Sequence, residues 1–346
     1  MAGESNRAVG GHQEGRTPRV IYVMGAGRSG STVLGTALGN CENVFFAGEL
    51  NEWLTRAGIP ALRDEQRLRF WQSVRAEVSV SQELLGGQAS CLERSSAVLR
   101  PSRWAKRRRL RQRYRRASED LYAAVARVAG VDYVVDTSHY PLRALELQAL
   151  TGIDLYLILL VRDPQGVVAS LGREDVPERT FGVFTANAYL WLTNLFSLMV
   201  FRRQPPARRL FVRHEEFIAD PARVIERILE QVGSSATPAG TELMHSGVPF
   251  HGNRLIRSPS ISLSQQPAPA RRARSPITWI LQLPWAAIFS GLRPSAETPC
   301  SADELDEAAS VQAPSQPAIG GRGDPGLDSA VTPSTGLDER DTACRS

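Results

Sequence analysis

The 346-residue sequence has little lysine, little cysteine and no very long apolar run. Lys106 is the single lysine, so nearly all of the 41 basic residues are arginine. The four cysteines show no C-x-x-C pairing and no histidine stands at metal-ligand spacing, which predicts neither a disulfide framework nor a metal site. The longest apolar runs, 154–161 and 189–201, are shorter than the ~20 residues that cross a bilayer. We therefore expect a cytoplasmic chain without signal peptide or transmembrane segment.

Charge is distributed unevenly along the chain. The net charge is +5, but residues 293–346 hold four Arg against ten Asp and Glu, which leaves about +11 for the preceding part. The same C-terminal stretch is rich in Pro, Ser, Ala and Gly, so we expect it to be a disordered acidic tail. Residues 1–17 lack apolar periodicity and are expected to be a flexible leader. One domain is predicted between them, over 18–292, with its last helix at 277–292.

Short runs of β-branched and apolar residues alternate with amphipathic stretches of helical length. This alternation predicts an α/β fold, a three-layer α/β/α arrangement with a central, mainly parallel sheet. Between the second and third predicted strands lies a mostly helical insertion, about 50–130, which would form a lid or bind an acceptor. Its apolar stripe has a 3.6-residue period and comprises Leu110, Tyr114, Ala117, Leu121, Val125 and Val128. The predicted strands are 19–24, 43–46, 133–135, 155–161 and 209–212.

A glycine-rich loop follows the first predicted strand and opens a helical stretch. Its backbone N–H groups and the positive end of the helix would form a cradle for an anion. The glycines at 25 and 30 keep the spacing of a nucleotide P-loop, but Ser31 stands where an NTPase has lysine. The cation is instead Arg28, inside the turn, which suits a transfer reaction whose donor is a mixed phosphate anhydride. The residues of the cradle are Gly27, Arg28, Ser29, Gly30, Ser31 and Thr32.

A second anion site is predicted after the apolar strand 155–161. There Arg162 stands at the carboxyl end of the strand and Ser170 lies about two turns into the next helix. A guanidinium and a hydroxyl so placed can both reach one phosphate.

Together the two motifs resemble those of bacterial sulfotransferases, the family that uses 3′-phosphoadenosine 5′-phosphosulfate (PAPS). The first is similar to the Arg-Ser-Gly-Ser/Thr-Thr loop of that family, and Arg162 and Ser170 match its Arg-Asp-Pro-x-x-x-x-x-Ser signature. The resemblance implies a P-loop-like fold whose phosphosulfate-binding loop is 27–32 and whose 3′-phosphate site is Arg162 and Ser170. It also implies that PAPS is the donor and that no metal is needed.

Two further stretches resemble the family more loosely. His214 stands where relatives often have a Tyr near the 3′-phosphate. Residues 251–257 resemble a late loop that closes over the nucleotide, implicating Gly252 and Asn253 there, with either Arg254 or Arg257 making the contact.

Sulfuryl transfer needs a base that activates the acceptor oxygen, and the sequence offers two. Glu49 lies 21 residues after Arg28, a distance similar to that of the catalytic Glu in protein-tyrosine sulfotransferases. His139 precedes Tyr140-Pro141 in a segment that resembles the one holding the catalytic His of cytosolic sulfotransferases. Either residue could be the base, and the other would contact the sulfuryl group. Each also has a purely structural interpretation, as a helix-start carboxylate or a loop histidine.

Residues 100–116 contain ten Arg or Lys and no acidic residue. Such a run is either a solvated helix face or a site that recruits an anionic or lipid-linked acceptor. Recruitment of a lipid-linked acceptor would involve peripheral membrane contact. Nucleic acid is the least favoured partner. The predicted reaction is sulfuryl transfer to a hydroxyl of a small molecule, glycan or glycolipid. A P-loop kinase, with Thr32 at the Mg²⁺ position, and a non-catalytic nucleotide-binding scaffold are the alternatives. No feature of the sequence indicates an oligomeric state.

Overall fold

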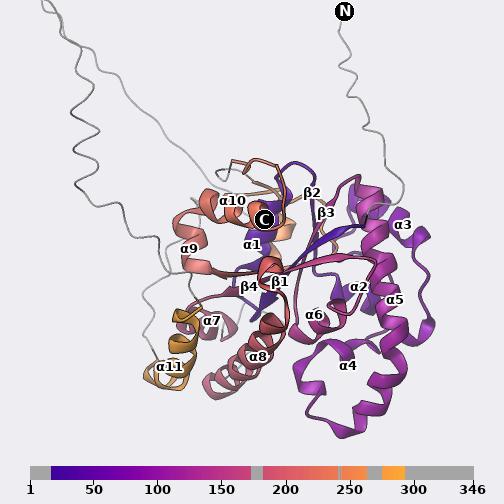
Figure 1. The fold of residues 1–346 in the computed structure, drawn as a ribbon. Coiled ribbons are helices and arrows are strands. Elements are labelled where there is room, and N and C mark those ends of the chain that lie inside the picture. The colour runs from indigo at the N-terminus through magenta and orange to yellow at the C-terminus, as the bar shows by residue number, and fades with distance from the viewer. Residues whose placement is uncertain (1–16, 173–181, 241, 243, 263–274, 293–346) are drawn as a thin grey trace, which may run out of the picture. The chain divides into compact units, whose positions relative to one another are not determined.

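The computed structural model describes residues 17–172, 182–240, 242, 244–262 and 275–292 (Figure 1). The chain divides into one unit from Met1 to Arg293 and a second from Pro294 to Ser346. The predicted acidic tail, and all of the predicted leader except Thr17, lie outside the described residues.

Five parallel strands form the central sheet in the order β2-β3-β1-β4-β5 (Figure 1). All five predicted strands are confirmed, each longer by one to four residues. The order of the strands reverses on either side of β1, because Val20 pairs with Val134 of β3 and with Leu155 of β4. In such sheets ligands bind outside the carboxyl ends of the strands at this reversal. The strands are β1 (Arg19–Gly25), β2 (Val44–Gly48), β3 (Tyr133–His139), β4 (Asp154–Val161) and β5 (Arg209–Arg213).

Helices cover both faces of the sheet, which confirms the predicted three-layer α/β fold. Successive residues of β1 alternate between two hydrophobic clusters, with Tyr22 in one and Ile21 and Val23 in the other. The Ile21 side is covered by α1 (Ser31–Gly39), α9 (His214–Ala219) and α10 (Pro221–Gln231). The Tyr22 side is covered by α5 (Trp104–Ala129), α6 (Pro141–Leu147), α8 (Val183–Arg203) and α11 (Pro276–Ser290). A further helix, α7 (Pro164–Leu171), packs against α8 and α11.

The insertion between β2 and β3 is helical, as predicted. It contains α2 (Asn51–Thr55), α3 (Glu65–Glu77), α4 (Ser90–Glu93) and α5, with single 3₁₀ turns at Gln82–Leu84, Ser95–Ala97 and Pro101–Arg103. The predicted apolar stripe lies on α5, where five of its six residues are buried and Val128 is half-buried. The helix ends at Gly130, whose left-handed backbone suits a C-terminal cap.

The C-terminal part of the domain adds small elements. A 3₁₀ turn Pro206–Arg208 precedes β5. A two-stranded antiparallel ribbon pairs β6 (Met244–His245) with β7 (Ser260–Ile261), and a 3₁₀ turn Arg254–Arg257 lies between these two strands in the chain.

Part of the Arg-rich run is used inside the fold. Glu146 of α6 is almost fully buried and accepts from Arg111 at 3.0 Å and Arg115 at 2.9 Å, with Arg107 at 3.9 Å. A buried carboxylate is stable only when cations and hydrogen bonds compensate its desolvation. One face of the run therefore joins α5 to α6, whereas Arg108, Arg109 and Arg116 are exposed.

Helix α8 is longer than the apolar run from which it was predicted. It has 21 residues and a mean hydropathy of 1.3 over its most apolar window, so by length and composition it could cross a membrane. The helix extends beyond the apolar run 189–201 on both sides, and the absence of a transmembrane segment stays a prediction. However, 44% of the window is buried in the domain, and α8 packs against β1 and β4. One side of α8 therefore belongs to the core of the domain.

Candidate active site

The glycine-rich loop after β1 has the backbone of an anion cradle. Gly25 allows the close approach of β4, because a Cβ there would collide with the carbonyl oxygen of Leu160. Gly30 has φ +96° and precedes α1 without a side-chain cap. The N–H groups of the first turn of α1 are thus directed over the loop with no capping side chain, as anion binding requires. Thr32 is buried in this turn, and Ser29 is buried beneath it.

The two predicted anion motifs meet in space. Arg28 Nε donates to Ser170 Oγ at 3.1 Å, and Arg162 Nη1 donates to the Arg28 carbonyl oxygen at 3.1 Å. All three side chains are half-buried. Because β1 and β4 are neighbours and parallel, the loop after one and the helix after the other share the same edge of the sheet. Two guanidinium groups and a hydroxyl are thereby concentrated beside the cradle.

His214 lies at the junction of these motifs. It is the first residue of α9 and buried, and a Cβ added at Gly30 would collide with its ring. Burial, together with the positive charge of Arg162, lowers the pKa of His214 to about 4, so the ring is neutral near pH 7. Its Nδ1 atom is buried without a hydrogen-bond partner in the described part of the chain. A buried orphan nitrogen between Gly30 and Arg162 fits a site that receives a ligand with donor or acceptor groups.

Glu49 follows β2 and is paired with a histidine that the sequence analysis did not single out. The Glu49 amide donates to the His251 carbonyl oxygen at 2.9 Å, and His251 Nδ1 lies 2.9 Å from Glu49 Oε2. Burial alone would raise the pKa of Glu49. The hydrogen bond from His251 and the charges of His139, His251 and Arg28 outweigh burial and lower it, so the carboxylate is ionised. The same pairing raises the pKa of His251 against the effect of its burial.

His139, the other predicted base, ends β3 with a left-handed backbone, φ +56°. Its ring packs on that of Tyr140, with centroids 4.3 Å apart. Its Nε2 atom lies 3.9 Å from the position a Cβ would take on Gly27, so it faces the anion loop. Burial lowers the pKa of His139, with the Glu49 carboxylate acting against it, and the ring can therefore accept a proton. The structure thus brings both candidate bases, Glu49 and His139, close to the glycine-rich loop.

The model of the Sulfotransferase family matches residues 18–238, which is more than half of the chain. The chain belongs to the sulfotransferase family. No curated protein matches. The match covers the glycine-rich loop, Glu49, His139, Arg162, Ser170 and His214, and it ends before His251.

Solved structures of sulfotransferases are similar to this family member at low identity. One is the sulfotransferase domain from the curacin biosynthetic pathway, at 17% identity and TM-score 0.46, covering 78% of this chain and 98% of that one. Another is the sulfotransferase domain of the Synechococcus PCC 7002 olefin synthase, at 18% and 0.40, covering 87% and 98%. A third is a sulfotransferase from Alicyclobacillus acidocaldarius, at 13% and 0.35, covering 79% and 92%.

In this sulfotransferase family member a buried carboxylate holds the two strand ends that carry the candidate bases. Asp136 of β3 is fully buried and accepts from the Ser138 amide at 2.8 Å and the Leu50 amide at 3.4 Å. Ser138 Oγ accepts from the Asn51 amide at 3.0 Å. The residues that follow Glu49 and precede His139 are thus joined. Buried polar residues in an otherwise apolar strand are the sequence signal that could have identified this support.

Tyr189 of α8 is a further contact that the sequence did not reveal. Its hydroxyl accepts from the Gly27 amide at 2.8 Å, across 162 positions of the chain. No local motif surrounds Tyr189. Its contact with the glycine-rich loop is therefore visible only in the folded chain.

The late loop is only partly brought to the site. Gly252 lies near Thr32, because a Cβ added to Gly252 would be 3.9 Å from Thr32 Cγ2. Asn253 Oδ1 accepts from the Arg254 amide at 2.6 Å and so caps the 3₁₀ turn. Arg254 and Arg257 are both exposed, and the structure does not distinguish which of them would meet a nucleotide.

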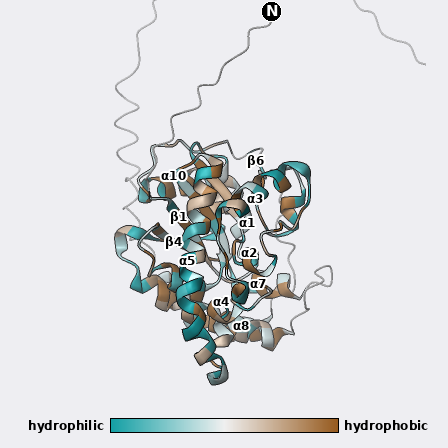
Figure 2. Ribbon diagram, turned by 90° about the vertical axis from the view of Figure 1, so that its right-hand side faces the viewer, coloured by the Kyte–Doolittle hydropathy of each residue, from teal (hydrophilic) through white to brown (hydrophobic). Residues whose placement is uncertain are grey.

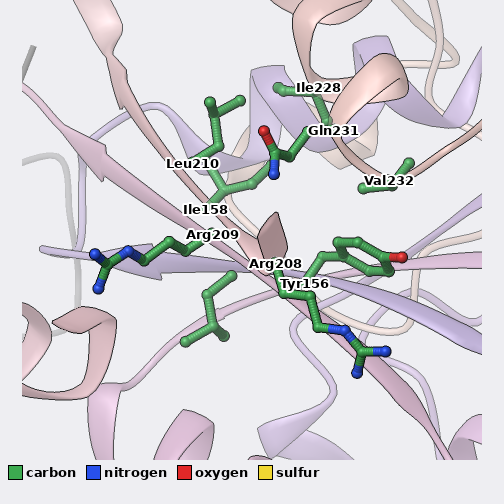
Figure 3. Close-up of a pocket in the computed structure, with 9 residues that line it drawn as sticks. Tyr156, Ile158, Arg208, Arg209, Leu210, Ile228, Gln231 and Val232 are labelled. Carbon is green, nitrogen blue, oxygen red and sulfur yellow. The ribbon is translucent and has the colours of Figure 1, made fainter. Parts of the chain in front are cut away.

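A small cavity elsewhere in the domain is unrelated to this site. It lies between the first halves of β4 and β5 and α10, with Tyr156, Leu210 and Gln231 among its lining residues (Figure 3). Its volume of about 10 Å³ has room for a single water molecule. The cavity is near the amino ends of the strands, whereas the anion loop is at their carboxyl ends.

Proposed function

We propose that this chain is a PAPS-dependent sulfotransferase that transfers a sulfuryl group to a hydroxyl of a small molecule, glycan or glycolipid by in-line displacement. The observation that carries the proposal is the contact of Arg28 with Ser170 and of Arg162 with the Arg28 carbonyl group. Two anion sites joined at one edge of the sheet fit a donor with phosphate groups at both its 3′ and 5′ positions. The orphan Nδ1 of His214 between these sites also fits such a donor.

The residues of the loop would act on the charge that develops during transfer. When bound, PAPS supplies the sulfuryl group, and its 5′-phosphate becomes the leaving group. The Arg28 guanidinium and the N–H groups at the start of α1 would stabilise negative charge on that phosphate. Arg162, Ser170 and His214 would hold the 3′-phosphate and so fix the position of the donor.

The acceptor proton would pass to one of the two candidate bases. Glu49 is ionised and held by His251, so its carboxylate can take the proton of an acceptor hydroxyl. His139 is half-buried and its pKa is lowered, so its neutral ring can do the same. Whichever is not the base would orient the sulfuryl group.

The proposal is tested by calorimetric titration with 3′-phosphoadenosine 5′-phosphate (PAP), the desulfated product, and in parallel with ATP and Mg²⁺. We expect PAP to bind and ATP to bind weakly. Arg162→Ala should weaken PAP binding roughly tenfold to a hundredfold, since it removes a charged hydrogen bond to phosphate. Arg116→Ala, on the exposed face of α5, is the matched control. Folded protein that ignores PAP and binds ATP would favour the kinase alternative, and PAP binding without transfer to any acceptor would favour the scaffold.

A further inference from the structure

Helix α8 presents a stripe of large apolar side chains to solvent. Phe184, Trp191, Leu195 and Met199 are 70%, 39%, 45% and 54% exposed. Their spacing of seven, four and four residues places them along one side of the helix. The opposite side carries the buried Thr193 and Ser197 and packs on the domain. The stripe is therefore the outer face of a helix whose inner face belongs to the core.

Helix α11 continues this apolar surface. It contains no charged residue, and its inner side packs against α7 and α8 through buried residues such as Trp285 and Phe289. On its outer side Trp279 is 62% exposed and Ile280 60%. The other exposed apolar residues of α11 are Ile277, Leu281, Leu283 and Ile288.

The two helices form one continuous surface, which we name the α8–α11 face. Trp191 Nε1 donates to the Leu281 carbonyl oxygen at 2.7 Å, and the Trp191 ring lies 5.1 Å from that of Trp285. Of the fourteen large apolar side chains that are exposed in the described residues, eleven lie on these two helices. Figure 2 shows the contrast, with α8 largely brown and the Arg-rich part of α5 teal. A concentration of this kind is typical of an interaction surface.

The charges around the face indicate which partner covers it. Neither helix contains an acidic residue, and α8 ends in the exposed Arg202 and Arg203. The chain up to residue 292 carries a net charge of about +11. Two copies that met through this face would bring two such positively charged bodies together, which charge repulsion disfavours. Residues 293–346 are also unsuited to cover the face, because they contain no aromatic residue and no apolar run.

We propose that the α8–α11 face docks this chain on the surface of an anionic phospholipid bilayer. Trp279, Ile280 and Phe184 would insert at the level of the headgroups, while Arg202 and Arg203 would meet the lipid phosphates. Docking does not depend on the proposed reaction. Where both hold, the donor site is joined to the docking face, because Gln165, three residues after Arg162, exchanges two hydrogen bonds with Ser275 at the start of α11. The acceptor would then be a hydroxyl-bearing lipid or lipid-linked molecule.

Sedimentation of the full chain with vesicles tests the proposal. We expect binding to vesicles of equal parts phosphatidylglycerol and phosphatidylcholine, weaker binding to phosphatidylcholine alone, and a loss of the difference in high salt. The double variant Trp279→Gln with Ile280→Gln should bind the anionic vesicles roughly tenfold less. Leu99→Gln, which alters a 65% exposed leucine of the insertion, is the matched control and should bind as the unmodified chain does.

Three outcomes would overturn the docking proposal. They are no binding of the unmodified chain, equal binding of the double variant, and a dimer in light scattering that the double variant dissociates. PAP titration of the same samples separates the two proposals, because the double variant leaves the donor site unchanged. Normal PAP binding without vesicle binding would remove only the docking proposal, whereas vesicle binding without PAP binding would remove only the proposed function.

Discussion

Arg28 Nε and Ser170 Oγ lie 3.1 Å apart, although 142 positions of the chain separate the two residues. The contact joins the loop after β1 to the helix after β4. It exists because these strands are adjacent and parallel, with Gly25 opposite Leu160 in register. A ligand held by the loop is thus within reach of groups from α7.

Replacing Arg28 tests the electrostatic role of the loop. Arg28→Ala should lower turnover by ~10² to 10³, the usual loss when a transition-state donor is removed. Arg28→Lys keeps the charge but not the planar fork, so we expect an intermediate loss. The measurement is the initial rate with labelled PAPS and an acceptor found by screening, with Arg116→Ala as the control. A folded Arg28→Ala protein with near-normal turnover would contradict the role.

Gly30 and Gly86 form a matched pair of glycines. Both have positive φ, but a Cβ at Gly30 would collide with His214, whereas a Cβ at Gly86 meets nothing within 4 Å. Gly86→Ala should cost only about 1–2 kcal/mol of stability from its left-handed backbone. Gly30→Ala should abolish PAP binding as well, because the loop and His214 must move apart. Equal PAP affinity in the two variants would show that His214 is not part of the donor site.

Much of the fold follows from the sequence, because each strand is a short apolar run flanked by helical periodicity. The two anion motifs could also be predicted, since their residues are close together in the chain. The partnership of Glu49 with His251 could not be predicted, because it is formed by a late segment that lies beside β2 only in the folded chain. Tyr189 was missed for the same reason, as its contact with Gly27 depends on how α8 crosses the sheet.

Two substitutions distinguish the candidate bases. We expect Glu49→Gln to be the more severe and to lower turnover by about 10² to 10⁴, because His251 holds this carboxylate in its ionised form. Since the pKa of Glu49 is lowered, activity should persist down to acidic pH and fall only below the usual carboxyl pKa of about 4.3. The measurement is the pH profile of turnover beside that of His139→Gln. If turnover is lost in His139→Gln and kept in Glu49→Gln, the base is His139 instead.

The pair of Glu49 and His251 should also make stability depend on pH. The pKa of His251 is raised on folding, so its contribution is complete below the unfolded value of about 6.5 and is lost as pH rises through the folded pKa. The pKa of Glu49 is lowered, so its contribution is present above about 4.3 and is lost as pH falls through the folded pKa. His251→Gln should therefore destabilise the chain most between these values. Urea unfolding across this range provides the measurement, and a difference that does not vary with pH would contradict the ion pair.

The buried carboxylate of Asp136 should be indispensable for the fold around the site. Asp136→Ala would leave Arg143, which is 1% exposed, without its carboxylate partner at 3.2 Å, and would remove the acceptor to which the Tyr122 hydroxyl donates. Removing one member of such a buried pair costs about 3–5 kcal/mol. Glu93, 3.5 Å from Arg143, is the nearest substitute, but burial raises its own pKa to about 7, so it compensates the charge poorly at neutral pH.

Urea unfolding of Asp136→Ala beside Asp163→Ala, an exposed aspartate, measures this cost. The double variant Asp136→Leu with Arg143→Met should recover stability, because it removes both charges together. It should not recover transfer, since the Leu50 and Ser138 amides that position Glu49 and His139 would still lack their acceptor. Recovery of both stability and transfer would show that Asp136 supports the fold alone and has no part in placing the two bases.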